Sequence, residues 1–247
     1  MTIHSNDELL GLQRVGHLVA RTLQHMRALV RPGITTAALD DAAARYARAE
    51  GGESAPQLTY DFPGFTCISV NEEIVHGIPG PRVLAAGDVV KLDVTLALGG
   101  FMADSAVTVL VPPVSPEARQ LQRTARIAFG KGVDAARPGR TMRSVGAAVE
   151  AAARKGGASV LRTLCGHGIG RALHEPPEVP NWGDPSATTV LREGMVFALE
   201  PMLSAGPARV VEERDGWTLR THNRVLAVHH EHTLVIQRGA PLLLTAA

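Results

Sequence analysis

The chain has 247 residues, a formal net charge of +1 and a charged fraction of 20%. A near-neutral chain offers no broad surface for polyanions, and 4% aromatic residues leave few side chains for stacking on bases. These figures exclude stable nucleic-acid binding as a main function, and the length suits one large domain or two small ones with a substantial core.

The first eight residues, Met1 to Glu8, are polar and acidic, whereas a signal peptide begins with a basic and then an apolar stretch. No run of about 18 apolar residues predicts a membrane span. Cys67 and Cys165 are too few for a disulfide scaffold. We therefore expect a cytoplasmic, reduced protein that does not enter membranes.

The predicted elements begin with a helix after Ser5-Asn6-Asp7-Glu8, which has the spacing of a capping box. Apolar residues then recur every three or four positions, as on one helix face, at Leu12, Val15, Val19, Leu23, Met26 and Val30. Pro32-Gly33 ends this helix. Thr35 or Thr36 can cap a second helix, which ends at Gly51-Gly52.

The sequence at this helix connection occurs twice. Arg31-Pro32-Gly33-Ile34-Thr35 returns as Arg137-Pro138-Gly139-Arg140-Thr141, 106 residues later (137 minus 31). The second copy also lies between two predicted helices, the first beginning at Ser115-Pro116-Glu117 and the second ending at Gly156-Gly157.

Strand-like segments follow each predicted helix pair. In the first half they are Cys67 to Val70, Asp88 to Leu96 and Phe101 to Val111, and in the second half Met195 to Leu203, Trp217 to Thr221 and Val225 to Ile236. This order predicts an α+β domain over residues 1–247, with two related halves at roughly 5–111 and 115–237. The alternative is that the repeated Arg-Pro-Gly-x-Thr segment is only a common connector between helices.

Two aspartates lie in a predicted hairpin around the turn Gly99-Gly100. If the glycines form a two-residue loop, Asp93 faces Ala106 and Asp104 faces Thr95. The aspartates then share one face of the hairpin, with side-chain roots about 7–8 Å apart or less. Two such carboxylates could share cations, although they could also face solvent or pair with arginines.

Three more residues interrupt apolar or glycine-rich segments. His167 lies in Cys165-Gly166-His167-Gly168-Ile169-Gly170, while Glu200 and Glu231 interrupt predicted strands. With the aspartates they supply four carboxylates and one imidazole, a set that suits Mn²⁺, Fe²⁺, Co²⁺ or Zn²⁺. Four carboxylates could neutralise two divalent ions.

Several stretches, in matching order, resemble the type I methionine aminopeptidases. They are Cys67-Ile68-Ser69-Val70-Asn71-Glu72-Glu73-Ile74-Val75-His76-Gly77-Ile78-Pro79, Lys91-Leu92-Asp93-Val94-Thr95, Gly100-Phe101-Met102-Ala103-Asp104-Ser105, Cys165-Gly166-His167-Gly168-Ile169-Gly170, His174-Glu175-Pro176-Pro177, Leu199-Glu200-Pro201-Met202 and Glu231-His232-Thr233. The resemblance implies the pita-bread fold, a pseudo-two-fold antiparallel sheet flanked by two helix pairs. It also implies removal of the N-terminal methionine from new proteins.

The resemblance also assigns roles to single residues. It implies that Asp93, Asp104, His167, Glu200 and Glu231 bind two divalent ions, Co, Mn, Fe or Zn. Glu200 is then the proton shuttle, His174 contacts the scissile amide, and His76 lies near the next residue of the substrate. Without such a motif, the remaining histidines are expected to be structural or surface residues: His4, His17, His25, His222, His229, His230 and His232.

The segment expected to bind the methionine side chain departs from the family pattern. Family members carry Y-x-G-[FY]-P before the cysteine, whereas this chain has Tyr60-Asp61-Phe62-Pro63, one residue shorter and without the glycine. Tyr60, Phe62, Cys67 and Trp217 are still expected to line an apolar pocket. Leu173 stands where the family often has an aromatic residue.

Other functions fit parts of this pattern. An Xaa-Pro peptidase shares the fold and the metal ligands. A non-catalytic peptide-binding protein of the same fold would be expected to lose some of these ligands, and a metal-dependent phosphatase would need a basic or amide-rich cradle for phosphate. Cys165 beside His167 could suggest a thiol enzyme, but a metal-ligating histidine is unavailable as its base. The expected partners are nascent polypeptide N-termini and, through the body of the domain, the ribosome; the expected state is a monomer.

Overall fold

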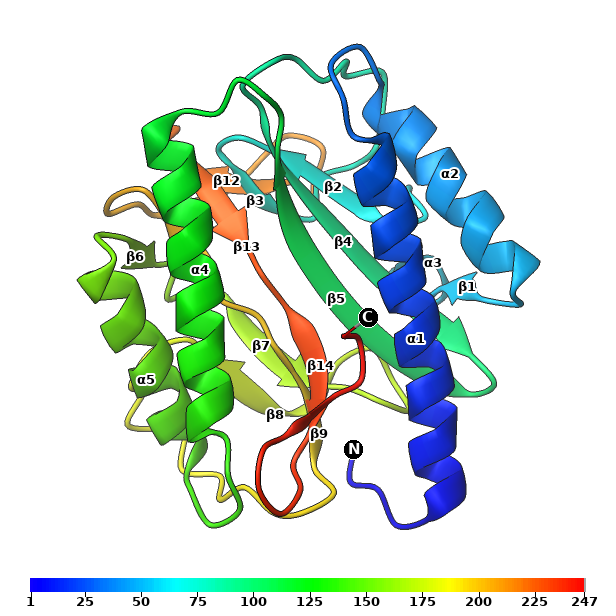
Figure 1. Cartoon of the computed structure of the whole chain (residues 1–247), viewed down its shortest axis with the longest axis vertical. Helices are drawn as coiled ribbons and strands as arrows, with labels where there is room; N and C mark the ends of the chain where they lie inside the picture. The colour runs from blue at the N-terminus through cyan, green and yellow to red at the C-terminus, as the bar shows by residue number, and fades with distance from the viewer. Residues whose placement is uncertain (247) are drawn as a thin grey trace.

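The computed structural model describes residues 1–246, which form five helices and fifteen strands (Figure 1). The helices are α1 (Asn6–Leu29), α2 (Thr36–Ala49), α3 (Ala55–Tyr60), α4 (Pro116–Ala135) and α5 (Met142–Lys155). The strands of the first half are β1 (Glu53–Ser54), β2 (Cys67–Val70), β3 (Glu73–Val75), β4 (Val89–Leu98) and β5 (Phe101–Leu110). Those of the second half are β6 (Ser159–Val160), β7 (Cys165–Gly168), β8 (Glu175–Pro180), β9 (Val196–Leu199), β10 (Met202–Ser204), β11 (Val210–Glu212), β12 (Leu219–Thr221), β13 (Ala227–His229), β14 (His232–Val235) and β15 (Leu242–Leu243).

The predicted helix pairs are α1 with α2 and α4 with α5, and local chemistry explains where they begin. The hydroxyls of Ser5, Thr35 and Ser115 accept hydrogen bonds from backbone N–H groups in the first turns of α1, α2 and α4. Glu8 completes the cap of α1 by accepting from the backbone N–H of His4 rather than that of Ser5. Thr141 begins α5 without a side-chain cap.

The two copies of the Arg-Pro-Gly-x-Thr segment make matching hydrogen bonds. Gly33 N–H donates to the carbonyl of Leu84 at 2.8 Å, and Gly139 N–H donates to that of Leu191 at 2.9 Å. Both glycines have positive φ, 89° and 82°, which explains the glycine at this position of each copy. An internal duplication predicts such a match.

All strand pairs are antiparallel and group into four sheets. The predicted register of the hairpin β4–β5 is confirmed, because Asp93 pairs with Ala106 and Thr95 pairs with Asp104. The long segments Met195 to Leu203 and Val225 to Ile236 are each two short strands. Their interruptions fall at Glu200-Pro201, between β9 and β10, and at His230-Glu231, between β13 and β14.

The halves meet where β5 runs beside β13 and β14 (Figure 1). The Thr233 hydroxyl bonds the backbone of Asp104 twice, accepting from its N–H at 2.9 Å and donating to its carbonyl at 2.8 Å. Glu231 N–H donates to the carbonyl of Ala106 at 2.9 Å. The hairpin that carries both aspartates is therefore fixed against the strands that flank Glu231.

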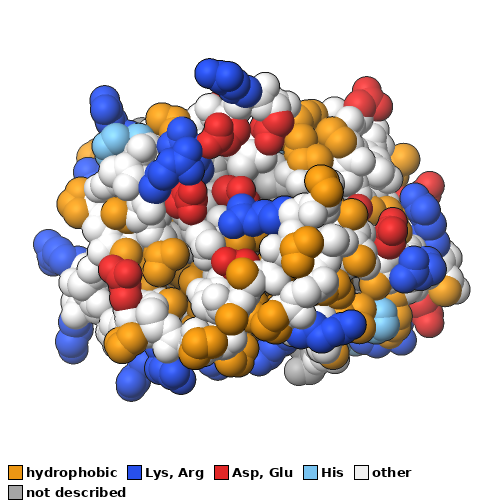
Figure 2. All heavy atoms as spheres, turned by 90° about the horizontal axis from the view of Figure 1, so that it is seen from above, with side chains coloured by type: hydrophobic (Ala, Val, Ile, Leu, Met, Phe, Trp, Pro, Cys, Tyr) orange, Lys and Arg blue, Asp and Glu red, His pale blue; other side chains and the backbone are white. Residues whose placement is uncertain are grey.

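A separate apolar core lies beneath each helix pair. One cluster includes Leu12, Leu39 and Leu92, and the other includes Phe129, Val149 and Phe197. Viewed from above, the surface has acidic and basic side chains lying close together among apolar ones (Figure 2). Within residues 1–246, no helix is long and apolar enough to cross a membrane.

Candidate metal centre

One cavity of about 360 Å³ collects the site residues that the sequence singles out. It opens between the hairpin β4–β5 and the strands of the second half. The predicted residues that line it are Tyr60, Phe62, Cys67, His76, Asp93, Asp104, His167, His174, Glu200, Trp217 and Glu231. Residues up to 171 positions apart in the sequence (231 minus 60) thus share one site.

The five predicted metal ligands come from both halves of the fold. Asp93 and Asp104 extend from β4 and β5, and His167 extends from β7. Glu200 and Glu231 occupy the two interruptions between short strands, where the chain leaves the regular ladder. All four carboxylates are largely removed from solvent, and Glu231 is only 1% exposed.

His167 presents a lone pair to the carboxylates. Its Nδ1 lies 3.0 Å from the carbonyl oxygen of Gly168 and donates to it, so Nε2 is the unprotonated nitrogen. Nε2 lies 3.4 Å from Glu200 Oε1 and 3.9 Å from Asp104 Oδ2. A lone pair facing carboxylate oxygens is the arrangement of ligands around a cation.

Burial and mutual repulsion dominate the electrostatics of this cluster. Burial raises the pKa of Asp93, Glu200 and Glu231 well above the usual carboxyl range, and the charge of Asp104 raises it further. Within residues 1–246, no hydrogen-bond partner meets Asp93 Oδ1, Asp104 Oδ1 or Glu231 Oε1. Buried carboxylates without partners are costly unless a cation neutralises them, so these residues fit a divalent metal centre.

The potential ligand atoms form two groups that share one residue. Asp104, His167 and Glu231 have ligand atoms within 4.8 Å of one another, and so do Glu200, His229 and Glu231. A carboxylate has two oxygens, so Glu231 can contact an ion in each group.

His229 corrects the sequence analysis, which expected a structural or surface residue. Its side chain is 2% exposed and lies against Glu200 and Glu231 inside the site. Burial lowers its pKa to about 3, so the ring is neutral. The signal that was missed is its spacing from Glu231, because residues two apart in extended chain face the same side.

The glycines around His167 explain how β7 packs so closely behind the site. A Cβ on Gly166 would lie 2.3 Å from the carbonyl oxygen of Ala198 and 3.2 Å from Cγ of Glu200. A Cβ on Gly168 would lie 2.3 Å from the carbonyl oxygen of Pro176. The close approach predicted from this glycine run is confirmed, and the neighbouring groups are β8 and β9.

His174 lies at the mouth of the cavity beside His167, with ring centroids 4.2 Å apart. Its Nδ1 is 2.5 Å from the hydroxyl of Tyr60, which comes from the end of the short helix α3. Although solvent reaches part of the ring, partial desolvation and His167 lower the pKa of His174 to about 4. Tyr60 therefore lines the cavity, as Phe62 and Trp217 do, and its hydroxyl contacts His174.

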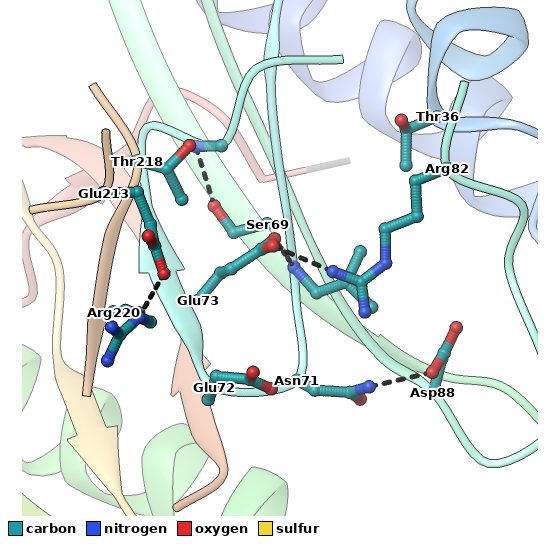
Figure 3. A network of polar contacts seen from close by, with 12 residues as sticks. Thr36, Ser69, Asn71, Glu72, Glu73, Arg82, Asp88, Glu213, Thr218 and Arg220 are labelled. Carbon is teal, nitrogen blue, oxygen red and sulfur yellow. Dashed lines mark hydrogen bonds and ion pairs between the residues drawn. The ribbon is translucent and has the colours of Figure 1, made fainter. Parts of the chain in front are cut away.

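His76 directly follows β3. Figure 3 shows polar contacts of Glu73, the first residue of this strand. The side chain of Glu73 accepts from the backbone N–H of Val70 at 2.6 Å and pairs with Arg82 at 2.8 Å. His76 itself has a φ of 59°, uncommon for a residue with a Cβ. Its side chain lies at the edge of the cavity.

The apolar end of the cavity is built around Phe62 and Trp217. Their rings meet edge to face, with centroids 5.1 Å apart. Val75, Leu164 and Met202 add apolar surface that the sequence analysis did not predict. Cys165 also lines this end, and burial raises the pKa of its thiol to about 11. A protonated thiol is a poor nucleophile, which argues against a thiol enzyme.

Comparison with known proteins identifies the family. The sequence pattern of metallopeptidase family M24 matches residues 11–238 of the chain.

The chain belongs to metallopeptidase family M24.

Within this family, the chain is 39% identical to methionine aminopeptidase 2 of Bacillus subtilis, with 99% of each protein covered. It is also 39% identical to methionine aminopeptidase B of Synechocystis, covering all of this chain and 92% of that relative. These comparisons confirm the predicted resemblance to type I methionine aminopeptidases. They make the protein a metal-dependent aminopeptidase, a hydrolase that binds divalent metal.

Solved structures of the family confirm the fold. The methionine aminopeptidase of Thermotoga maritima superposes with a TM-score of 0.96 at 34% identity, covering all of both chains. The prolidase of Pyrococcus furiosus shares the fold with a TM-score of 0.80 but only 19% identity, and the match covers 66% of that chain. The pita-bread fold of the M24 family is therefore confirmed, and the Xaa-Pro peptidase alternative is not favoured.

Proposed function

We propose that this protein removes N-terminal methionine from polypeptides at a centre of two divalent ions, Mn²⁺, Fe²⁺, Co²⁺ or Zn²⁺. Asp93, Asp104, His167, Glu200 and Glu231 hold the ions in this proposal. The observation that carries it is the presence of two adjacent ligand groups that share Glu231 inside one buried cluster. When bound, such ions activate water and polarise the scissile carbonyl.

The proton transfers of the reaction fall to Glu200. Its carboxylate belongs to one of the two ligand groups and lines the cavity, so it lies beside any water held at the centre. Glu200 accepts a proton from the attacking water and passes it to the departing amine. Asn181 holds the backbone of this residue by donating to its carbonyl at 3.0 Å.

His174 stabilises the negative charge that develops on the scissile amide. We assign the Tyr60 hydroxyl as the donor to Nδ1 of His174, 2.5 Å away; the proton of the neutral ring is then on Nε2, which can donate to the substrate. His76, at the cavity edge, contacts the second residue of the substrate. A small second residue is expected because both histidines crowd this mouth.

The methionine side chain of the substrate occupies the apolar end of the cavity. Phe62, Trp217 and Met202 offer the aromatic and thioether surface that suits an unbranched, polarisable side chain, and Cys67 forms the wall next to Asp93. The substrates are nascent polypeptide N-termini in the cytoplasm. The protein acts as a monomer and contacts the ribosome through the surface of this domain.

Peptide cleavage tests the proposal. Metal-stripped protein is given Mn²⁺ or Co²⁺ in turn and incubated with Met-Ala-Ser or Ala-Pro-Ala, and free amino acids are measured. Methionine release from the first peptide, only with metal, is the expected result. Cleavage confined to the proline peptide, or no cleavage by protein with bound metal, would contradict it.

A further inference from the structure

His229 presents an imidazole to the same carboxylates as His167. Its Nε2 lies 3.4 Å from Glu231 Oε2 and 3.6 Å from Glu200 Oε2. Within the described chain, residues 1–246, neither ring nitrogen has a hydrogen-bond partner, although the side chain is only 2% exposed. Such a buried and unpartnered polar ring calls for a ligand.

The backbone fixes this orientation. The Thr108 hydroxyl accepts from the N–H of His229 at 3.0 Å and donates to its carbonyl at 2.8 Å. The next residue, His230, directs its ring to the helix side, where it meets Phe129 edge to face at 5.0 Å. Alternation along the chain therefore places His229 and Glu231 together in the site and His230 behind it.

The distances match those between two ligands of one ion. Two ligand atoms, each about 2.1 Å from an ion and at a tetrahedral angle, lie about 3.4 Å apart, whereas hydrogen-bonded atoms lie about 2.7–3.2 Å apart. His229 Nε2 lies 3.4 Å from the nearest carboxylate oxygen of Glu231 and 3.6 Å from that of Glu200. His167 Nε2 stands at the similar distances of 3.4 and 3.9 Å from Glu200 and Asp104.

We propose that His229 is a sixth protein ligand of the metal centre, binding one divalent ion through Nε2 together with Glu200 and Glu231. This inference rests on the proposed two-ion centre and adds a residue to it. Each ion then has one imidazole, from His167 or from His229. A second nitrogen ligand shifts the preference of the site towards Co²⁺ and Zn²⁺ and away from Mn²⁺, which favours oxygen ligands.

X-ray absorption spectroscopy of the Zn²⁺-loaded wild-type protein tests this directly, with bound zinc measured separately. Two zinc-bound imidazoles per chain are expected, and one imidazole would overturn the proposal, since His167 alone accounts for it. Because this measurement uses the wild type, it does not depend on how a variant folds. A wild-type protein that retains no zinc would instead contradict the proposed metal centre itself.

Two variants sharpen the test. His229→Gln should lower the imidazole count to one per chain, while the matched control His230→Gln should keep two. His229→Gln should also weaken Zn²⁺ binding by about 10–100-fold, the scale known for residues that orient metal ligands, with a smaller loss for Mn²⁺. Equal losses for both ions, or an unchanged imidazole count, would show that His229 is not a ligand.

Discussion

Replacing Glu231 with glutamine should stabilise the metal-free protein and remove most of the stabilisation that metal gives the wild type. In the described structure, Glu231 has an oxygen within 4.8 Å of a ligand atom of Asp104 and of Glu200. At an effective dielectric constant of about 20, each such pair of charges repels by at least about 3.5 kcal/mol, so Glu231 meets about 7 kcal/mol when all are ionised. An unsatisfied buried amide costs about 1–3 kcal/mol in return. Glu231→Gln should therefore stabilise the metal-free protein by several kcal/mol at alkaline pH.

The sign of the pH dependence follows from the raised pKa values. The folded state keeps protons on Glu200 and Glu231 that the unfolded chain has already released. The stability of the metal-free protein therefore falls as pH rises from the usual carboxyl range through the raised pKa values. Each such carboxylate contributes up to about 1.4 kcal/mol per pH unit. Removing Glu231 should make this decline shallower, so its stabilising effect grows with pH.

Urea unfolding in the presence of a chelator, at mildly acidic, neutral and alkaline pH, measures this difference. Added metal at 100 times its Kd should stabilise the wild type by about 2.7 kcal/mol and Glu231→Gln by much less. Equal stability of the two metal-free proteins at every pH would refute the repulsion argument. So would a difference that shrinks as pH rises.

Three further substitutions test the roles proposed for single side chains. Glu200→Gln should lower kcat by about 10²–10⁴-fold and largely spare peptide binding, as measured by calorimetry. Substantial remaining activity would show that Glu200 does not transfer the proton. Tyr60→Phe deletes the 2.5 Å contact that orients His174, so kcat should fall several-fold with little change in KM, and a change in KM alone would contradict this. Phe62→Leu removes the ring that packs on Trp217 and should lower kcat/KM for methionine peptides about tenfold. An equal loss for peptides with other N-terminal side chains would count against a methionine pocket.

The sequence was most informative where local chemistry leaves few options. The turn Gly99-Gly100, with both glycines at positive φ, determines the register of the hairpin, and that register places Asp93 and Asp104 on one face. Helix starts at Ser5 and Ser115 followed from hydroxyl caps. Periodicity and capping act over a few residues, so a single sequence contains the information needed to predict them.

Features that depend on distant contacts were not predictable from the sequence. The position of Tyr60 depends on α3 and on a hydrogen bond to a residue 114 positions away. The strands predicted as continuous across Glu200 and Glu231 are interrupted there, because each glutamate leaves the ladder to enter the cavity. His229 was overlooked because strand alternation indicates a shared face but not that this face lines a metal centre.

The position of the proposed metal centre follows from how the two halves are joined. Asp93 and Asp104 belong to the first half, whereas His167, Glu200 and Glu231 belong to the second, and each half has its helix pair packed on its own core. Between them, β5 meets β13 and β14 through side-chain bonds such as that from the Thr108 hydroxyl to the His229 carbonyl. Carboxylate repulsion is therefore concentrated at the joint between the halves, where within residues 1–246 no strand ladder pairs β5 with β13 or β14. A cation held by ligands from both halves would remove that repulsion and also connect the halves, so catalysis and stability would then depend on the same site.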